Sequence, residues 1–430
     1  MALTGISGAD LLAGERDVDA SGLGTVVGLS TDGTSWSVAS LPGSGDLLIG
    51  QPTLEQVVQV TPELGNTSEL QINAIFTAPA AAYGESIAVL PLPTSPEAFD
   101  LWVAAPDANE GRGSLYRYPG ADAARDIESP ARLVVRSTTE ADHLGTHLFP
   151  CADLTGDGLP ELVASIPWWQ PSTGLTILDG REVPPLAGAI VVLDSEAVAE
   201  ATGEQRPWDL GPVYWGTTAG AGVGPGVTCD RDLDGDGRPD LAVGEPRADD
   251  QAGAVHLIAG PLPDSGPLDE VAWRTIASPG EGAWFGESLA AFSWDSEPYL
   301  LIGAPGVAEG QGAAYLYRPL DELPLEPVGV YESSRDTPDH VGRTVAAADL
   351  DGDGQDELLV AAPDYRVDNN TFGVGRLWIF GRDVGLAPDL ADATGILTDT
   401  QPFRRIGRDL VLTDIDGDDA TDLWLPTQRE

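Results

Sequence analysis

The sequence predicts an all-β fold, a seven-bladed β-propeller of four-stranded blades whose last blade is closed by the N-terminal strand. Three observations predict it. An apolar–glycine pair recurs seven times, each pair precedes an apolar segment that ends in proline, and 52 glycines and 35 prolines indicate short strands separated by turns. We therefore expect a single propeller domain over residues 1–430.

The apolar–glycine pair marks the start of each predicted blade, and successive glycines lie 56 to 79 residues apart. A period of this length, with four short strands in each unit, is typical of propeller blades. The blades are predicted to begin near Gly24, Gly84, Gly145, Gly224, Gly286, Gly342 and Gly407.

The remaining elements of each unit follow in a constant order. An apolar segment ending in proline comes about twenty residues after the pair, as in LLIGAP (300–305) and LLVAAP (358–363). A glycine followed by alternating apolar residues comes next, as in GAVHLI (253–258), and a more polar strand closes the unit, as in VAWRTI (271–276). One such unit cannot bury both of its faces, so the units are predicted to pack against one another in a ring.

The two ends of the chain form incomplete units. The last unit stops shortly after LWLP (423–426), before its outer strands. Residues 11–13 precede Gly24 at the spacing by which Trp273 precedes Gly286. Residues about 3–13 are therefore predicted to complete the last blade, which would remove exposed strand edges. The alternative, a series of unrelated β-hairpin domains, leaves the period and both ends unexplained.

Four units carry an acidic loop between their first and second strands: 153–161, 232–240, 349–357 and 414–422. Acids or a hydroxyl stand at positions 1, 3, 5 and 9, and position 7 offers a backbone carbonyl. Such a ring of hard oxygens suits Ca²⁺, and the interleaved glycines allow the tight turn. We predict four Ca²⁺ sites. Their ligands are Asp153, Thr155, Asp157, Leu159, Glu161, Asp232, Asp234, Asp236, Arg238, Asp240, Asp349, Asp351, Asp353, Gln355, Glu357, Asp414, Asp416, Asp418, Ala420 and Asp422.

An EF-hand and a metal-free turn are the two alternatives to such a site. An EF-hand needs a glutamate at position 12 and flanking helices, but position 12 is apolar in all four loops, so the position-9 acid must close the site. A metal-free turn is common for one such loop and improbable for four in register. The loops 232–240 and 349–357 are predicted to bind most tightly, because Thr155 replaces an acid and Asp419 replaces a glycine in the other two.

Three units lack the acidic spacing: Leu92–Ala98, Trp294–Tyr299 and the long connection Thr31–Gly45. Their turns are predicted to hold without metal.

The charge is strongly negative, with 69 acidic residues against 22 basic ones, all arginine, and a net charge of −47. This charge repels phosphate backbones and anionic lipid, so nucleic-acid and membrane-surface partners are disfavoured. No apolar run is long enough to span a bilayer, so we expect no direct membrane insertion. The start of the chain lacks the features of a signal peptide, and we expect any signal or anchor segment to be absent from this chain.

The two cysteines, Cys151 and Cys229, are compatible with one disulfide in an oxidising compartment or with two buried free thiols. They lie six and five residues after the glycines of consecutive blades. Neighbouring inner strands approach each other, but the opposite strand parity argues against a bridge.

The motifs together resemble the FG-GAP repeats of the integrin α-subunit N-terminal propeller: Phe285-Gly286, the acidic loop DLDGDGRPD (232–240), LLIGAP (300–305) and a Gly-x-x-Tyr-Leu segment (312–316). The resemblance covers essentially the whole chain. It implies a seven-bladed propeller with Ca²⁺ in loops on one face and a role in adhesion or protein recognition. In integrin α-subunits the aromatics before the glycines form a cage for a basic residue. Only Tyr83 and Phe285 are aromatic there, so we expect neither a complete cage nor an integrin-style heterodimer.

We accordingly expect a monomeric binding module, extracellular, on the cell surface or periplasmic, with a protein or glycan ligand. Trp168 and Trp169 lie on a long insertion and either form a sticky patch or pack against the neighbouring blade. A glycan-binding propeller would repeat an aromatic in most blades, but among the tryptophans only Trp102 and Trp424 recur in register.

An enzyme is the remaining alternative, because some propellers that bind Ca²⁺ carry hydrolases. No nucleophile elbow, HExxH or Walker loop is found, and the carboxylates that a glycosidase would need are committed to metal. His143 and His340 share one repeat position, which indicates a structural role. We therefore predict no catalytic residues and no organic cofactor.

Overall fold

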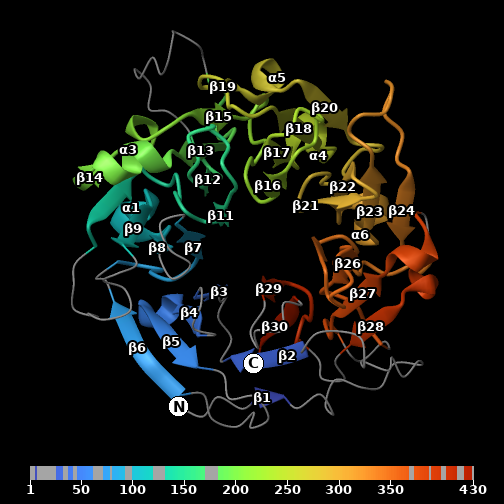
Figure 1. The fold of residues 1–430 in the computed structure, drawn as a ribbon. Coiled ribbons are helices and arrows are strands. Elements are labelled where there is room, and N and C mark those ends of the chain that lie inside the picture. Colours follow the sequence, from blue (N-terminus) through green and yellow to red (C-terminus); the bar gives the residue numbers. More distant parts are fainter. Residues whose placement is uncertain are drawn as a thin grey trace. The chain divides into compact units, whose positions relative to one another are not determined.

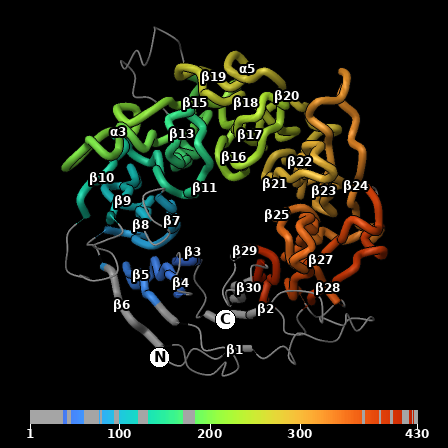
Figure 2. The backbone as a smooth tube through the Cα atoms, in the orientation of Figure 1, coloured from blue at the N-terminus to red at the C-terminus, as the bar shows by residue number. Residues whose placement is uncertain are grey.

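The computed structural model describes residues 5–6, 26–31, 37–41, 46–61, 71–77, 80–92, 99–119, 131–169, 183–367, 372–386, 389–398, 403–413 and 421–428. The chain divides into two compact units. One comprises residues 1–34, 62–71 and 278–430, and is called the terminal unit below; the other comprises residues 35–61 and 72–277, and is called the middle unit. Figure 1 labels the elements, and Figure 2 traces the backbone in the same orientation.

The middle unit contains four sheets, and in each the strands follow one another in sequence order from one edge. Two of these sheets gain a fifth strand that runs parallel to the fourth, β14 beside β10 and β19 beside β15. These additions cover strand edges that would otherwise be open. The strands are β3 (Val38–Ser40), β4 (Leu47–Gln51), β5 (Gln56–Thr61) and β6 (Gln71–Thr77); β7 (Ile87–Pro91), β8 (Phe99–Ala105), β9 (Ser114–Pro119) and β10 (Leu133–Arg136), with β14 (Gly203–Gln205); β11 (Leu148–Pro150), β12 (Leu162–Ile166), β13 (Ala189–Leu193) and β15 (Val213–Trp215), with β19 (Gly266–Pro267); and β16 (Val227–Arg231), β17 (Asp240–Glu245), β18 (Ala254–Ile258) and β20 (Arg274–Ala277).

The terminal unit contains two further antiparallel sheets of four strands and a sheet made from both ends of the chain (Figure 1). The antiparallel sheets are β21 (Leu289–Trp294), β22 (Glu297–Ala304), β23 (Ala313–Tyr317) and β24 (Gly329–Glu332), and β25 (Thr344–Ala348), β26 (Glu357–Ala362), β27 (Arg376–Phe380) and β28 (Gly395–Thr398). The third sheet has the order β29 (Val411–Thr413), β30 (Asp422–Gln428), β2 (Val26–Thr31) and β1 (Gly5–Ile6).

Helices of the described residues are single turns or little more, which confirms the all-β propeller class. They are α1 (Ala108–Gly111), α3 (Ser195–Glu200), α4 (Ala248–Gln251), α5 (Leu268–Val271), α6 (Val307–Gly310), and the 3-10 turns η1 (Pro52–Leu54), η2 (Pro207–Asp209), η3 (Arg382–Val384) and η4 (Leu390–Asp392). Within the described segments, no helix has the length and apolar character that crossing a bilayer requires.

The predicted count of seven regular blades needs correction. Six sheets have the blade pattern of four successive strands, whereas the sheet of the chain ends is mixed, because β2 runs parallel to β30 with Val26 opposite Leu423. The segment after Gly24 therefore pairs with the chain end and does not begin the first blade. That blade begins instead with β3, which lies inside the predicted connection Thr31–Gly45.

Residues about 3–13 were predicted to complete the last blade. Of these, the described part is β1, which pairs with β2 at the edge of the mixed sheet. Residues 7–13 and Gly24 lie outside the described residues. The strand that pairs directly with β30 is β2.

The core lies between the faces of neighbouring sheets. The second strand of a blade is buried along its whole length in β8, β12, β17 and β26, because it has a sheet partner on both sides and packed side chains on both faces. In the middle unit, Val163 and Val192 of one blade pack with Leu241 and Val243 of the next. The repeated apolar segments ending in proline are these buried strands.

Cys151 and Cys229 form a disulfide that joins two successive blades of the middle unit. The expectation from strand parity was wrong, for two local reasons. Cys151 lies just beyond the end of β11, and the pairing of β16 with β17 shifts register between Thr228 and Arg231, so regular alternation fails at Cys229. Closing a loop of 78 residues is expected to stabilise the fold by about 4 kcal/mol through the unfolded chain.

Candidate metal-binding loops

Three of the four predicted acidic loops lie within the described residues. They connect β11 to β12 (153–161), β16 to β17 (232–240) and β25 to β26 (349–357). In the fourth loop, Asp414, Asp416, Asp418 and Ala420 lie outside the described residues, whereas Asp422 begins β30 and is buried. The acidic pattern thus falls between the first and second strands of its blade, as predicted from the sequence.

The position-1 acid organises each loop by accepting hydrogen bonds from the backbone. Asp232 accepts from Gly235 N at 2.6 Å through Oδ1 and from Gly237 N at 2.8 Å through Oδ2. Both glycines have positive φ, 84° and 90°, which only glycine adopts without strain. Asp153 and Asp349 make the same pair of bonds in their own loops. The glycines of the motif are therefore required by backbone conformation.

The position-9 acid closes each loop from inside the blade. Asp240 accepts through Oδ2 from Leu233 N at 2.8 Å and through Oδ1 from Gly260 N at 2.9 Å. Glu161 accepts from Leu154 N at 2.6 Å, and Glu357 accepts from Leu350 N at 2.8 Å. The acid at the start of the second strand, or one residue before it in the case of Glu161, thus holds the start of the loop, and it is buried in each case.

The acids of each loop converge. One carboxylate oxygen from each of three residues lies within 4.8 Å of the others in the groups Asp153, Asp157 and Glu161; Asp232, Asp234 and Asp240; and Asp349, Asp351 and Asp353. These groups of hard oxygens have the composition that Ca²⁺ prefers. Asp236 and Glu357 belong to their loops but fall outside the groups, and Thr155 Oγ1 donates to Glu161 Oε1 at 3.3 Å.

The position-7 residues take part through their backbone amides. Leu159 N, Arg238 N and Gln355 N each donate to the position-5 acid of the same loop, at 2.7 to 2.9 Å. Their predicted role as carbonyl ligands stays a prediction. The position-5 acid uses one oxygen in this bond, which leaves its second oxygen for a cation.

The raised pKa values of the position-9 acids indicate that the surrounding protein does not fully stabilise their ionised forms. The pKa of Glu161 is raised to about 7, chiefly by burial and also by the neighbouring Asp157 and Asp153, against the backbone bond from Leu154. Burial likewise raises the pKa of Glu357 to about 7. The pKa of Asp240 is also raised, chiefly by burial. A divalent cation at these loops would favour the ionised carboxylates.

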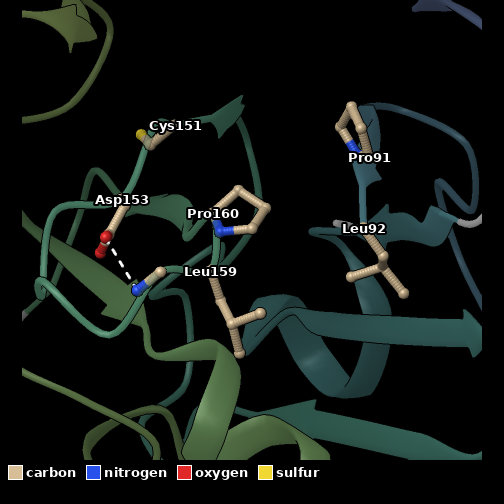
Figure 3. Close-up of a pocket in the computed structure, with 7 residues that line it drawn as sticks. Pro91, Leu92, Cys151, Asp153, Leu159 and Pro160 are labelled. Carbon is tan, nitrogen blue, oxygen red and sulfur yellow. Dashed lines mark hydrogen bonds between the residues drawn. The ribbon is translucent and has the colours of Figure 1, made fainter. Parts of the chain in front are cut away.

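The loops contact their neighbours within each unit. Leu262 N donates to Leu154 O at 3.1 Å in the middle unit, and Thr421 N donates to Asp349 O at 3.0 Å in the terminal unit. A hollow of about 370 Å³ lies between the loops 153–161 and 232–240. A second hollow of about 410 Å³ lies between Pro160 and Pro91; Figure 3 shows its lining, with Asp153 and Leu159 on one side and Leu92 on the other.

The two tryptophans singled out in the sequence have different environments. Trp169 is fully buried and packs against Trp215 with 6.1 Å between ring centres. Trp168 is 39% exposed, and the Arg247 guanidinium lies 5.3 Å from its ring centre. Trp102 is buried in the core, and the side chain of Trp424 lies outside the described residues.

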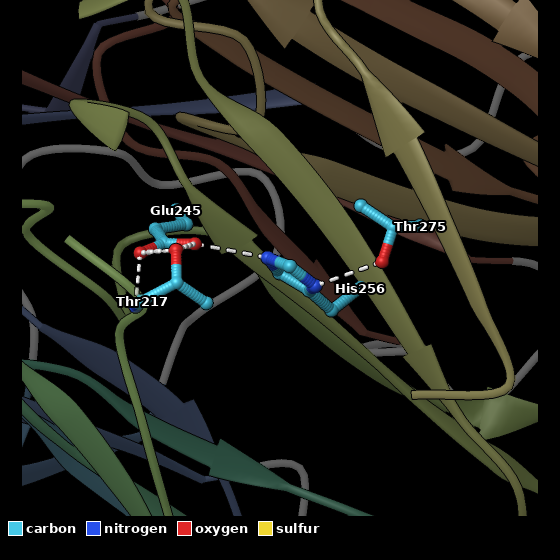
Figure 4. A network of polar contacts seen from close by, with 4 residues as sticks. All are labelled: Thr217, Glu245, His256 and Thr275. Atoms are coloured by element: carbon cyan, nitrogen blue, oxygen red, sulfur yellow. Dashed lines mark hydrogen bonds and ion pairs between the residues drawn. The ribbon is translucent and has the colours of Figure 1, made fainter. Parts of the chain in front are cut away.

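A buried polar network was not predicted from the sequence. His256 Nε2 lies 2.9 Å from Glu245 Oε2, and Thr217 N donates to Glu245 Oε1 at 2.6 Å (Figure 4). The second ring nitrogen of His256 lies 3.1 Å from Thr275 Oγ1. The only signal for it in the sequence was Glu245, an acid inside the apolar segment LAVGEP. Its partner, His256, lies on the next strand. His143 and His340 also contact carboxylates, those of Asp107 and Asp364.

Comparison with known proteins agrees with this architecture. The FG-GAP repeat family matches residues 227–258 and 341–380, which include the loops 232–240 and 349–357. Phosphatidylinositol-glycan-specific phospholipase D of Rattus norvegicus is 34% identical over 153 residues, 32% of this chain and 18% of that protein. Integrin alpha-IIb is 32% identical over 149 residues in Mus musculus, 32% of this chain and 14% of that protein, and 32% identical over 155 residues in Homo sapiens, 33% and 14%.

The matched region spans less than a fifth of the length of these relatives. Their similarity is therefore to a part of each protein. The chain thus contains FG-GAP repeats, and about a third of it is similar to part of integrin alpha-IIb.

Proposed function

We propose that this chain is a Ca²⁺-binding propeller module that recognises other proteins outside the cytoplasm. The observation that carries the proposal is the convergence of three carboxylates in each of three described loops, each loop closed by a buried acid at the start of a strand. The fourth loop, which ends at Asp422, has the same acidic spacing and is proposed as a fourth site.

Calcium would act in these loops as a cross-link between strands. With the cation bound, the position-1 acid holds the turn, the position-9 acid holds the strand, and the repulsion between them is removed. Four Ca²⁺ ions would add 8 positive charges to −47 and leave −39, so the protein would stay strongly acidic. Calcium is therefore proposed as a structural ion.

An extracellular or periplasmic location is supported by the disulfide between Cys151 and Cys229, because such bonds persist in oxidising compartments. The loops have many exposed acids and no flanking helices, and in this they resemble the calcium sites of extracellular modules. Such modules bind Ca²⁺ with Kd values of about 10⁻⁴–10⁻³ M. The excess negative charge continues to disfavour nucleic acid and anionic membrane surfaces as partners.

We infer binding without catalysis. His143, His256 and His340 contact carboxylates or threonine within the fold, and the carboxylates of the loops accept hydrogen bonds from backbone amides. The similarity to a phospholipase D covers 18% of that enzyme, so it carries no catalytic assignment to this chain. A protein ligand is proposed, with a glycan as the alternative.

The calcium proposal is tested by thermal unfolding of the protein in EDTA and in increasing CaCl₂. Cation that binds the folded state raises the free energy of unfolding by about 2.7 kcal/mol per site at a hundred times its Kd. The variant Asp234→Asn should lose part of this gain. The control Asp230→Asn, an exposed acid outside the loop that pairs with Arg231, should keep it. An unchanged melting temperature of the wild type up to about 10 mM CaCl₂, roughly ten times the weakest Kd of extracellular modules, would refute the proposal.

The recognition proposal is tested by probing a protein array and a glycan array with the labelled protein in calcium and in EDTA. Protein hits that disappear in EDTA are expected. Glycan hits alone would replace the proposal by its alternative. Release of a phosphatidylinositol-glycan-anchored reporter protein by the purified chain would contradict the inference that it is not an enzyme.

A further inference from the structure

Two loops of the terminal unit form a surface of arginine and exposed apolar side chains. We call Arg366, Val367, Phe372, Phe403 and Arg405 the arginine–aromatic patch. Phe403 N donates to Phe372 O at 2.9 Å, and Arg405 N donates to Gly373 O at 2.9 Å, so the two loops are joined through their backbones. The two loops therefore lie side by side at the patch.

The apolar members of the patch are unusually exposed. Val367, Phe372 and Phe403 are 56%, 44% and 40% exposed. They are three of the eight large apolar side chains that are exposed in the described part of the chain. Apolar side chains gathered on one surface and bordered by charge are typical of interaction sites.

The patch lies at the opposite end of its blade from an acidic loop. The loop 349–357 leads into β26, whereas Arg366 and Val367 follow the end of β26. Phe403 and Arg405 precede β29, and that strand runs toward the acidic segment 414–422. The negative charge of the loops and the arginines of the patch are thus separated by the length of a strand.

Arg366 forms no close ion pair within the described segments, and its charge acts on the buried Asp339. Its guanidinium carbon lies 4.5 Å from the centre of the Phe372 ring. A stacked guanidinium presents its flat face to the ring and keeps its N–H groups at the edge, where they can grip a carboxylate in bidentate fashion. Arg405 is 42% exposed and lies 3.6 Å from Asp364. This ion pair is long, so a ligand carboxylate that approaches the guanidinium more closely can replace it.

We propose that the arginine–aromatic patch is a docking surface for an acidic protein segment that carries an apolar residue between its carboxylates. The proposal deepens the proposed protein-recognition function and rests on it. The apolar residue covers Phe372 and Phe403, and the carboxylates pair with Arg366 and Arg405. At 0.15 M salt the Debye length is about 8 Å, so the remaining negative charge of the chain is screened beyond the patch.

The test is fluorescence anisotropy with a labelled peptide in which Asp-Leu-Glu units are joined by glycine, at 0.15 M NaCl with calcium. Arg366→Gln is expected to weaken binding at least about tenfold, because a charge-assisted bond is lost. Phe372→Ala should weaken it as well. The matched control Arg318→Gln removes an equal charge from an arginine that pairs with Glu297 and Asp321, and should bind as the wild type.

The inference would be overturned if wild type, Arg366→Gln and Phe372→Ala bound the peptide equally. It would also be overturned if a peptide with Asn and Gln in place of the acids bound as well as the acidic one. Binding of heparin without binding of the peptide would overturn it too. The calcium-induced rise in melting temperature, measured on the same samples, separates the two proposals. A rise without peptide binding refutes this inference alone, whereas a missing rise refutes the proposed function.

Discussion

Two successive blades of the terminal unit connect their first and second strands in different ways. In one, Trp294 pairs with Glu297, so that Asp295 and Ser296 alone turn the chain. Their φ values of 52° and 66° are both positive, as in the type I′ turns that suit the twist of a hairpin. In the other, the eight residues 349–356 connect β25 to β26, with carboxylates as turn formers.

The difference shows that the blade itself does not need an acidic loop. The short hairpin closes the same pair of strands with backbone conformation, and no cluster of acids is found there among the described residues. The long loop buries Glu357 and gathers Asp349, Asp351 and Asp353, an arrangement that raises carboxylate repulsion. Such a cost is consistent with selection for cation binding. The two connections also touch, since Trp294 Nε1 donates to Asp356 O at 3.0 Å.

Removing calcium is expected to give the largest difference in amide exchange between the loop 349–357 and the hairpin at Asp295. In EDTA we expect the amides of the loop 349–357 and the start of β26 to exchange with deuterium faster, because the cross-link between strands is lost. The hairpin at Asp295 should keep its protection. Hydrogen exchange with mass spectrometry measures both, and equal deprotection of the two connections would remove the distinction between them.

Replacing a single acid of the loop 349–357 should remove much of the stability that calcium adds. We expect Asp351→Asn to reduce the calcium-dependent gain by about 2 kcal/mol, comparable to one well-occupied site. Asp295→Asn, the matched change in the hairpin, should leave the gain unchanged. Denaturant unfolding with and without CaCl₂ measures the two gains, and a loss in Asp295→Asn as large as that in Asp351→Asn would contradict the comparison.

The buried Glu357 should respond to pH in opposite ways with and without calcium. Its folded pKa of about 7 lies above its ordinary 4.5, so without calcium the folded protein binds the proton more tightly and stability falls as pH rises through that window. With calcium the ionised form is favoured, and stability should rise instead. The variant Glu357→Gln should stabilise the calcium-free protein and weaken the calcium response. Thermal unfolding between pH 4.5 and 7 tests this, and parallel pH profiles would refute it.

The contact between the two connections should have the smallest effect. Trp294→Phe keeps the aromatic packing of the hairpin but removes the bond to Asp356 O, and is expected to cost about 1 kcal/mol. Because the ring also packs on Phe292 and Tyr299, Trp294→Ala serves as the comparison for lost packing and should cost more. Chemical unfolding distinguishes them, and equal costs would show that the hydrogen bond contributes nothing.

Much of the fold could be predicted from sequence because its signals are local. The apolar segments ending in proline are buried second strands, and the loops 153–161, 232–240 and 349–357 fall where the motif placed them. The connection Trp294–Tyr299, which lacks the acidic spacing, contains a tight turn between Trp294 and Glu297. These features depend on side-chain periodicity and on glycines that adopt positive φ, both of which are visible in one short segment.

The features that were missed depend on long-range pairing. The strand after Gly24 pairs in parallel with β30, nearly four hundred residues away, in place of starting a regular blade. The disulfide escaped prediction because the register shift before Arg231 changes which way Cys229 faces. The network of Glu245 and His256 joins two strands whose register could not be known in advance.

By itself the sequence determined the repeat, the acidic spacing and the places where the chain must turn, because each is fixed by residues within a few positions of one another. Tertiary structure alone decided the mixed sheet at the chain ends, the bridge between Cys151 and Cys229 and the joining of Phe372 to Phe403. Each of these brings distant segments together, and the energy of such a pairing depends on surfaces that exist only after folding.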